Sequence, residues 1–127
     1  MANIIPDAFK SELLSGTHNF ANGGNTFKIA LFTDISGYST SSTTYSTTNE
    51  VSSSGTNYSA GGNALDSQAV SVASNTALVD FADEVFSSVT LSAVGAVIYN
   101  DTNSDKLVVV LDFGGTKTAT NGDFTIQ

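Results

Sequence analysis

The chain has 127 residues and a mass of 13.1 kDa, a length that suits one domain with a hydrophobic core of its own. It contains no cysteine, which excludes disulfides, thiolate zinc sites and thiol nucleophiles. Four lysines, no arginine and twelve acidic residues give a net charge of -8, which argues against nucleic acid or an anionic membrane surface as a direct partner.

The N-terminal residues carry no basic leader with an apolar segment behind it. No apolar run in the sequence approaches the roughly 18 residues that a membrane-spanning helix needs. We therefore expect a soluble protein that is made in a cytoplasm and has no membrane partner.

The first expected element is a short amphipathic helix over about Asp7 to Ser15, within an N-terminal arm and helix of residues 1–16. Phe9 and Leu13 lie near helical spacing. Gly16 can end the helix, because glycine readily takes the left-handed backbone conformation of a C-terminal cap.

A strand is expected at Phe27 to Thr33, followed by a long Ser/Thr-rich loop over residues 34–63. Between Ser36 and Thr48, ten of thirteen residues are serine or threonine. Loops this long in a compact domain are usually functional or disordered, because they order backbone without burying much apolar surface.

The second half of the chain is rich in β-branched residues and turn signals. The turn-rich segment Asn100 to Asp105 predicts a hairpin between the strands on either side of it. Asn121-Gly122 predicts a tight type I′ turn before a last strand. The expected strands are Gln68 to Ala73, Ala77 to Ala82, Val89 to Tyr99, Leu107 to Phe113 and Asp123 to Gln127.

These elements predict a mainly β protein, with residues 1–127 forming a single antiparallel β-sandwich domain that is jelly-roll-like and has one short N-terminal helix. The apolar runs Ala93 to Tyr99 and Leu107 to Leu111 suit strands covered on both faces. The cover is expected to be a second sheet with the helix, or a neighbouring subunit.

Catalytic residues are sparse. His18 is the single histidine, and it lies in a loop outside any nucleophile elbow, so we interpret it as an ordinary loop histidine. Asp80, Asp83 and Glu84 form a carboxylate cluster, but acid-base work on glycosides needs an enclosing cleft that so short a chain rarely builds. The sequence therefore predicts no enzyme and no cofactor.

A calcium loop is suggested by the spacing of Asp101, Asn103 and Asp105, whose oxygens fall at alternate positions. Lys106 stands where such a loop needs glycine, and an apolar strand follows at once. We interpret the segment as an ordinary hairpin tip and expect no metal.

Binding is indicated by three of the four tyrosines, Tyr38, Tyr45 and Tyr58, which are spread through serine, threonine, glycine and asparagine in the long loop. In recognition loops, rigid tyrosines anchor a partner while small polar residues form hydrogen bonds. These three residues are the candidate interface, and a flexible linker-like loop is the alternative.

Several segments together resemble a family of small virion proteins of tailed bacteriophages, over about Phe9 to Gln127. The VDFAD and IYND strings, Gly61-Gly62 and Phe113-Gly114-Gly115 are the most specific parts of the resemblance. It is carried by AFKSELLSGTHNF, NTFKIALFTD, TNEVSSSGTNYSAGG, VDFADEVFSSVTLSAVGAVIYND and LVVVLDFGGTKTATNGDFTIQ.

The resemblance implies a structural role on the capsid surface as a decoration or cement protein, with the major capsid protein as partner. A homo-oligomer, either dimer or trimer, is also expected. The alternative is a binding module on tail or capsid that recognises host glycans or proteins.

Overall fold

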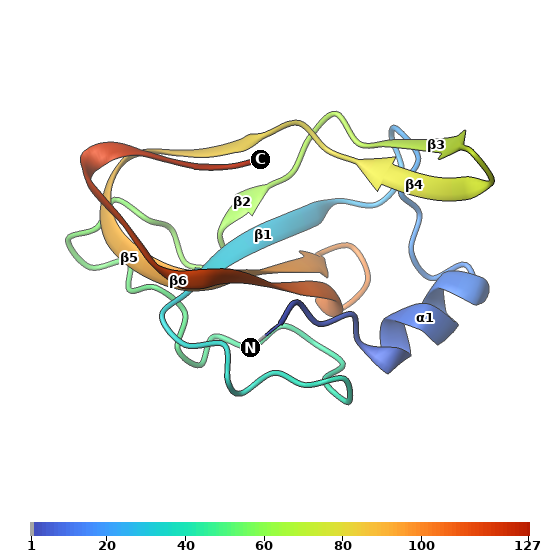
Figure 1. Ribbon diagram of the computed structural model, residues 1–127, viewed down its shortest axis with the longest axis horizontal. Helices are drawn as coiled ribbons and strands as arrows, with labels where there is room; N and C mark the ends of the chain where they lie inside the picture. Colours follow the sequence, from blue (N-terminus) through green and yellow to red (C-terminus); the bar gives the residue numbers. More distant parts are fainter. Residues whose placement is uncertain (1) are drawn as a thin grey trace.

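The computed structural model describes residues 2–127 and is mainly β, with antiparallel sheets and one short helix (Figure 1). The helix α1 is Asp7–Leu14, and the strands are β1 (Phe27–Phe32), β2 (Asn63–Ala64), β3 (Ala69–Ala73), β4 (Thr76–Asp80), β5 (Glu84–Asn100) and β6 (Lys106–Ile126). This confirms the expected fold class. The strand order β2-β1-β5-β6 is compatible with a sandwich, although the jelly-roll topology in particular is not confirmed.

The helix α1 lies where the sequence predicts it. Gly16 follows it with φ +78°, the left-handed conformation expected of a glycine after a helix end. No residue of the helix is fully buried. On the side of the helix that faces the core, the Phe9 ring contacts His18 and Phe20. It therefore covers the edge of the core and leaves Leu13 and Leu14 on the surface.

The strands β5 and β6 form one long hairpin that bends back over the sheet (Figure 1). Residues 95–100 of β5 pair with β1, while its first half pairs only with the second half of β6. Phe86 and Phe124, from the bent-back half, belong to the same core as Phe27, Ile29 and Leu31 of β1. The hairpin thus supplies a second layer over this core itself.

The predicted turn at Asn121-Gly122 is wrong, because β6 continues through it to Ile126. Gly122 pairs with Val89, and Asn121, at φ +45°, lies where the register shifts by one residue. The left-handed backbone that favours a hairpin turn also suits a β-bulge. The expected strands Leu107 to Phe113 and Asp123 to Gln127 therefore fall on one strand, β6, which ends at Ile126.

The bend in the hairpin lies at Gly114-Gly115. Between Ala93 and Gly95 of β5, the partner position in β6 jumps from Lys117 to Asp112, so β6 carries extra residues here. Gly114 has φ +75°, and a bulge with a left-handed residue increases twist and bends the strand. The bulge allows the two halves of the hairpin to face one another.

The second face of the sheet is covered by the long loop, which is ordered along its length. Ile35 and Tyr38 pack with Phe32, Val97 and other sheet residues in a second core cluster. Figure 1 shows this loop on the side of the sheet opposite the C-terminal half of β6. The sequence predicted either a second sheet with the helix or a neighbouring subunit as the cover of these strands. On this face the cover is the long loop.

Backbone hydrogen bonds join the loop to the strands at several points. The Thr33 N–H donates to the Asn49 carbonyl at 2.9 Å, and the Leu107 N–H donates to the Thr43 carbonyl at 2.9 Å. These bonds tie the middle of the loop to the end of β1 and the start of β6, so that the loop forms one wall of the fold.

Candidate interaction surface

The three candidate tyrosines point inward. Tyr58 is 3% exposed and Tyr38 9% exposed, and Tyr45 is half-buried with its ring stacked on Tyr99 at 4.3 Å. Side chains in these positions cannot anchor a partner without opening the loop. In this closed arrangement the rings of Tyr38 and Tyr58 hold the loop on the sheet, and the interface at the three tyrosines stays a prediction.

The Glu50 carboxylate joins two of these tyrosines to the backbone. The Tyr45 and Tyr58 hydroxyls donate to its two oxygens at 2.5 and 2.7 Å, and the Gly61 N–H donates at 2.7 Å. The Tyr58 hydroxyl also accepts a hydrogen bond from the Leu31 N–H. Burial, followed by the bond to Glu50, raises the pKa of both tyrosines above 10, so they remain neutral donors.

His18 is buried, at 6% exposed, in a polar cluster behind α1. Its Nδ1 lies 3.0 Å from the Asn100 amide nitrogen, which can only donate, so Nε2 carries the proton and faces Glu12 at 3.4 Å. Glu12 in turn pairs with Lys106 at 2.8 Å. Both ring nitrogens of His18 are therefore engaged within the fold.

The stability of the protein should fall in acid partly through His18. Burial lowers the pKa of this imidazole below 6.5, more than the bond to Glu12 raises it. The unfolded chain therefore takes up the proton first as the pH falls below 6.5, and stability is lost from there down to the folded pKa. In thermal melts between pH 7 and 5, His18→Gln should lose less stability than the wild type, and equal losses would contradict this.

The carboxylates named from the sequence do not all lie in one pocket. Asp80, Asp83 and Glu84 line a small pocket of about 180 Å³, and Glu84 accepts a hydrogen bond from the Asn63 side chain. Asp101 faces Lys28 at 3.5 Å. Within residues 2–127, no three histidine or acidic side chains come together in a way that could hold a metal ion.

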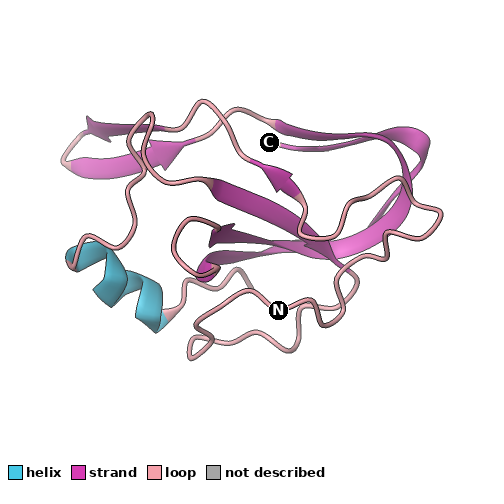
Figure 2. Cartoon of the chain, turned by 180° about the vertical axis from the view of Figure 1, so that it is seen from behind, coloured by secondary structure: helices cyan, strands magenta, loops and turns pink. Residues whose placement is uncertain are grey.

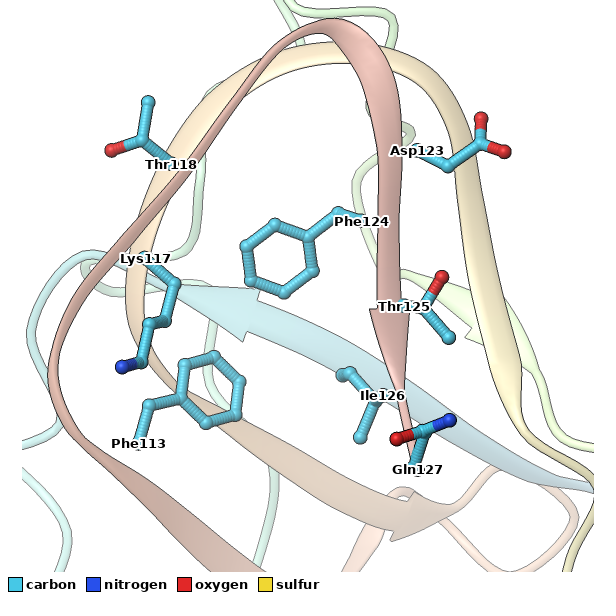
Figure 3. Close-up of a pocket in the computed structure, with 8 residues that line it drawn as sticks. All are labelled: Phe113, Lys117, Thr118, Asp123, Phe124, Thr125, Ile126 and Gln127. Atoms are coloured by element: carbon cyan, nitrogen blue, oxygen red, sulfur yellow. The ribbon is translucent and has the colours of Figure 1, made fainter.

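A second cavity lies inside the bend of β6 and has a volume of about 430 Å³ (Figure 3). Phe113 and Phe124 come from the two halves of the strand, with ring centroids 5.9 Å apart, and Lys117 lies beside Phe113. The bulge at Gly114-Gly115 brings these residues together. The sequence holds no motif for this cavity, because it depends on how sharply one strand bends.

The most exposed apolar surface is the β3–β4 hairpin, which forms a two-stranded sheet of its own. All ten of its strand residues are exposed, including Val72 at 74% and Val70 at 57%. The cross-strand pairs Val70–Val79 and Val72–Ala77 place these four aliphatic side chains on one face. Water-exposed valines in such a cluster are a mark of a protein contact surface.

Helix α1 and this hairpin lie at the same end of the molecule (Figures 1 and 2) and enclose an open groove of about 540 Å³. Phe9 and Leu13 contribute from the helix, and Val70 and Val79 contribute from the hairpin. We call this the helix-hairpin groove. The remaining lining residues are His18, Asn19, Phe20, Ala21, Ala77 and Leu78, so that nearly all of its surface is uncharged and apolar.

Comparison with known proteins adds no relative, since no protein-family model, no curated protein and no solved structure matches this chain. Among the residues that the structure describes, no helix has the length and apolar character needed to cross a membrane.

Proposed function

We propose that this protein is a non-enzymatic structural subunit of a phage virion, which binds the major capsid protein and stabilises the capsid lattice as a decoration or cement protein. The observation that carries a binding role is the helix-hairpin groove, an apolar surface that the chain leaves open. Its placement in a phage particle is supported by the resemblance over about Phe9 to Gln127.

A cement role needs only a surface that fits the assembled lattice. A protein that binds the lattice and not its separated subunits stabilises it by mass action. Symmetry repeats the contact over the whole shell, so that a modest interface at each site gives a large total effect. An uncharged groove suits this role, because screening of charges by salt has little effect on an apolar contact.

The charge distribution favours the outer surface of the capsid over a surface that faces DNA. The net charge is -8, and three of the four lysines are paired with carboxylates. These pairs are Lys10–Asp7, Lys28–Asp101 and Lys106–Glu12. Such a surface offers few cations to phosphate groups, which are the main source of affinity for nucleic acid.

Binding to shells should depend on Leu13, which lines the groove and is 46% exposed. The expected result is that wild-type protein co-sediments with expanded, undecorated shells of its phage and raises their melting temperature. Leu13→Asp should weaken this binding about tenfold or more, because it places a carboxylate in an apolar contact.

Leu14→Asp is the matched control, because Leu14 is the next residue, is 92% exposed and lies outside the groove. It carries the same charge change at the same end of the helix and should leave binding nearly unchanged. If the wild type does not bind shells, the cement function is refuted. Equal weakening by both variants would refute the groove as the contact.

The alternative function, recognition of host glycans or proteins, has one feature in its favour. Tyr38 and several loop hydroxyls, including those of Ser42 and Thr44, line a groove of about 330 Å³. Glycan sites usually offer an exposed aromatic face to the sugar, whereas Tyr38 is 9% exposed. We therefore rank this function second, and binding to host cells without binding to shells would reverse the order.

A further inference from the structure

The outer strand of the hairpin, β3, has an edge that nothing in the described chain covers. It pairs with β4 on one side, and no backbone hydrogen bond joins its other side to residues 2–127. In both views of the molecule it lies outermost, with β4 between it and the body (Figures 1 and 2). Its free N–H and C=O groups therefore face outward and can accept another strand.

Proteins normally protect such an edge with a charge, a proline or a bulge, because an open edge pairs with other chains. The sequence of β3 is AVSVA, and its pairing with β4 runs without a register shift. None of the three forms of protection is present. In addition, an isolated two-stranded hairpin is only marginally stable in water, and a third strand with a shared apolar face stabilises it.

The partner strand that fits best is β3 of a second copy. From Ser67 to Val79 the chain has no charged residue, although its net charge is -8, so two copies can meet here without bringing carboxylates together. Strongly charged surfaces elsewhere would oppose self-association. The uncharged segment is thus the place where like-charged copies can approach.

The sequence of β3 is also self-complementary. When two copies pair antiparallel about Ser71, each Val70 lies opposite Val72 of the other copy, and each Ala69 lies opposite Ala73. Because side chains alternate along a strand, the valines of both copies share one face. Directly opposed β-branched side chains of this kind stabilise a sheet.

We propose that the protein forms a two-fold symmetric dimer in which the β3 strands of two copies pair antiparallel about Ser71, making a four-stranded sheet in the order β4-β3-β3-β4. The apolar faces of both hairpins then form one surface that is continuous between the two helix-hairpin grooves. The dimer goes beyond the proposed function and does not depend on it.

The test uses Ser71, which is exposed and lies at the two-fold axis, directly opposite its own copy. The wild type should show the mass of a dimer in light scattering at high protein concentration. Ser71→Lys and Ser71→Glu should each raise the dissociation constant about tenfold or more, because like charges then face each other. An equal mixture of the two variants should dimerise again, since opposite charges then meet at the axis.

Thr76→Lys is the matched control, because Thr76 is exposed on the same face of the hairpin but belongs to β4. It should dimerise as the wild type does. A weak dimer can be trapped through Ser71→Cys, since the protein has no cysteine of its own. Opposed residues in an antiparallel pair have their Cα atoms about 4.5–5.5 Å apart, within reach of a disulfide.

A wild type that stays at the mass of one chain, together with Ser71→Cys that does not cross-link, would overturn the dimer. A dimer that both charged variants leave intact would also overturn it, because another surface would then hold it. Either result leaves shell binding to be measured separately. A protein that dimerises through Ser71 but does not bind shells would refute only the proposed function.

Discussion

Replacing Glu50 with alanine is expected to lower the free energy of unfolding by about 3 kcal/mol, because three donors lose a charged acceptor at once. The donors are the hydroxyls of Tyr45 and Tyr58 and the N–H of Gly61. Tyr58 is almost fully buried, so its hydroxyl cannot turn to water instead. Urea unfolding followed by tyrosine fluorescence gives the free energy directly.

The single tyrosine variants divide this effect into its parts. Tyr45→Phe should cost less than Tyr58→Phe, because Tyr45 is half-buried while the Tyr58 hydroxyl also accepts from the Leu31 N–H. Removing Tyr58 Oη leaves that buried N–H without its acceptor. If Glu50→Ala unfolds at the wild-type urea concentration, the carboxylate does not hold the loop on the sheet.

Replacing Gly62 with alanine is expected to destabilise the protein by about 4 kcal/mol or more, or to prevent folding. A Cβ atom at this position would lie 1.8 Å from the carbonyl oxygen of Ile29, in the centre of β1. That oxygen belongs to the backbone and cannot turn aside. The variant can be scored by its soluble yield and by its urea midpoint.

Gly23→Ala separates this clash from backbone strain. Gly23 has φ +80°, close to the +76° of Gly62, but a Cβ there would meet no atom within 4 Å. It should therefore cost only about 1 kcal/mol, the usual penalty for a left-handed alanine. Equal destabilisation by the two variants would show that strain, and not the approach of Gly62 to β1, is what matters.

The positions of most elements could be predicted from the sequence with fair accuracy, because they have local signals. The two-residue strand β2 was not predicted, and it falls at the end of the expected loop. The alternation Phe27, Ile29, Leu31 gives β1, and Gly16 ends the helix as expected. The turn at Asn121-Gly122 was predicted wrongly, because a bulge and a hairpin turn use the same left-handed backbone. Only the long-range pairing of Gly122 with Val89 distinguishes the bulge from a hairpin turn.

The candidate surfaces were harder to predict. Tyr38, Tyr45 and Tyr58 have the composition of a recognition loop, yet the sheet needs a cover on its second face, and the loop supplies it. A tyrosine with a buried ring and a carboxylate acceptor looks the same in sequence as an exposed one. The sequence did contain one sign that two of these tyrosines are held within the fold. Glu50, the hydrogen-bond acceptor of Tyr45 and Tyr58, is the one acidic residue between Ser36 and Asn63.

The β3–β4 hairpin differs from the tyrosines, because its apolar residues look buried in the sequence and are exposed in the structure. Its valines follow the same alternation as those of a buried strand, so the pattern predicts the strands but not their exposure. The exposure of these valines depends on where the hairpin lies. The hairpin extends away from the four-stranded sheet, toward the end of the molecule that holds α1 (Figure 1). The absence of charge from Ser67 to Val79 was visible in the sequence, and it is one of the observations on which the proposed contact of two copies rests.

The proposals assign separate tasks to adjacent surfaces. We propose that the helix-hairpin groove contacts the capsid protein and that the β3 edge joins two copies, while the Tyr45–Glu50–Tyr58 hydrogen bonds keep the long loop closed over the sheet. In a lattice under internal pressure, a dimer that binds through both grooves would bridge two neighbouring subunits. The second contact would then be intramolecular, which strengthens the whole attachment.

The central claim is that the protein belongs to the capsid shell, and its copy number in purified virions tests this most directly. Quantitative mass spectrometry against the major capsid protein should give hundreds of copies per particle, because a cement subunit repeats with the symmetry of the shell. A count of about six to a dozen would place the protein at the tail, since closed rings of that size occur there. Such a count, or the absence of the protein from the particle, would contradict the account.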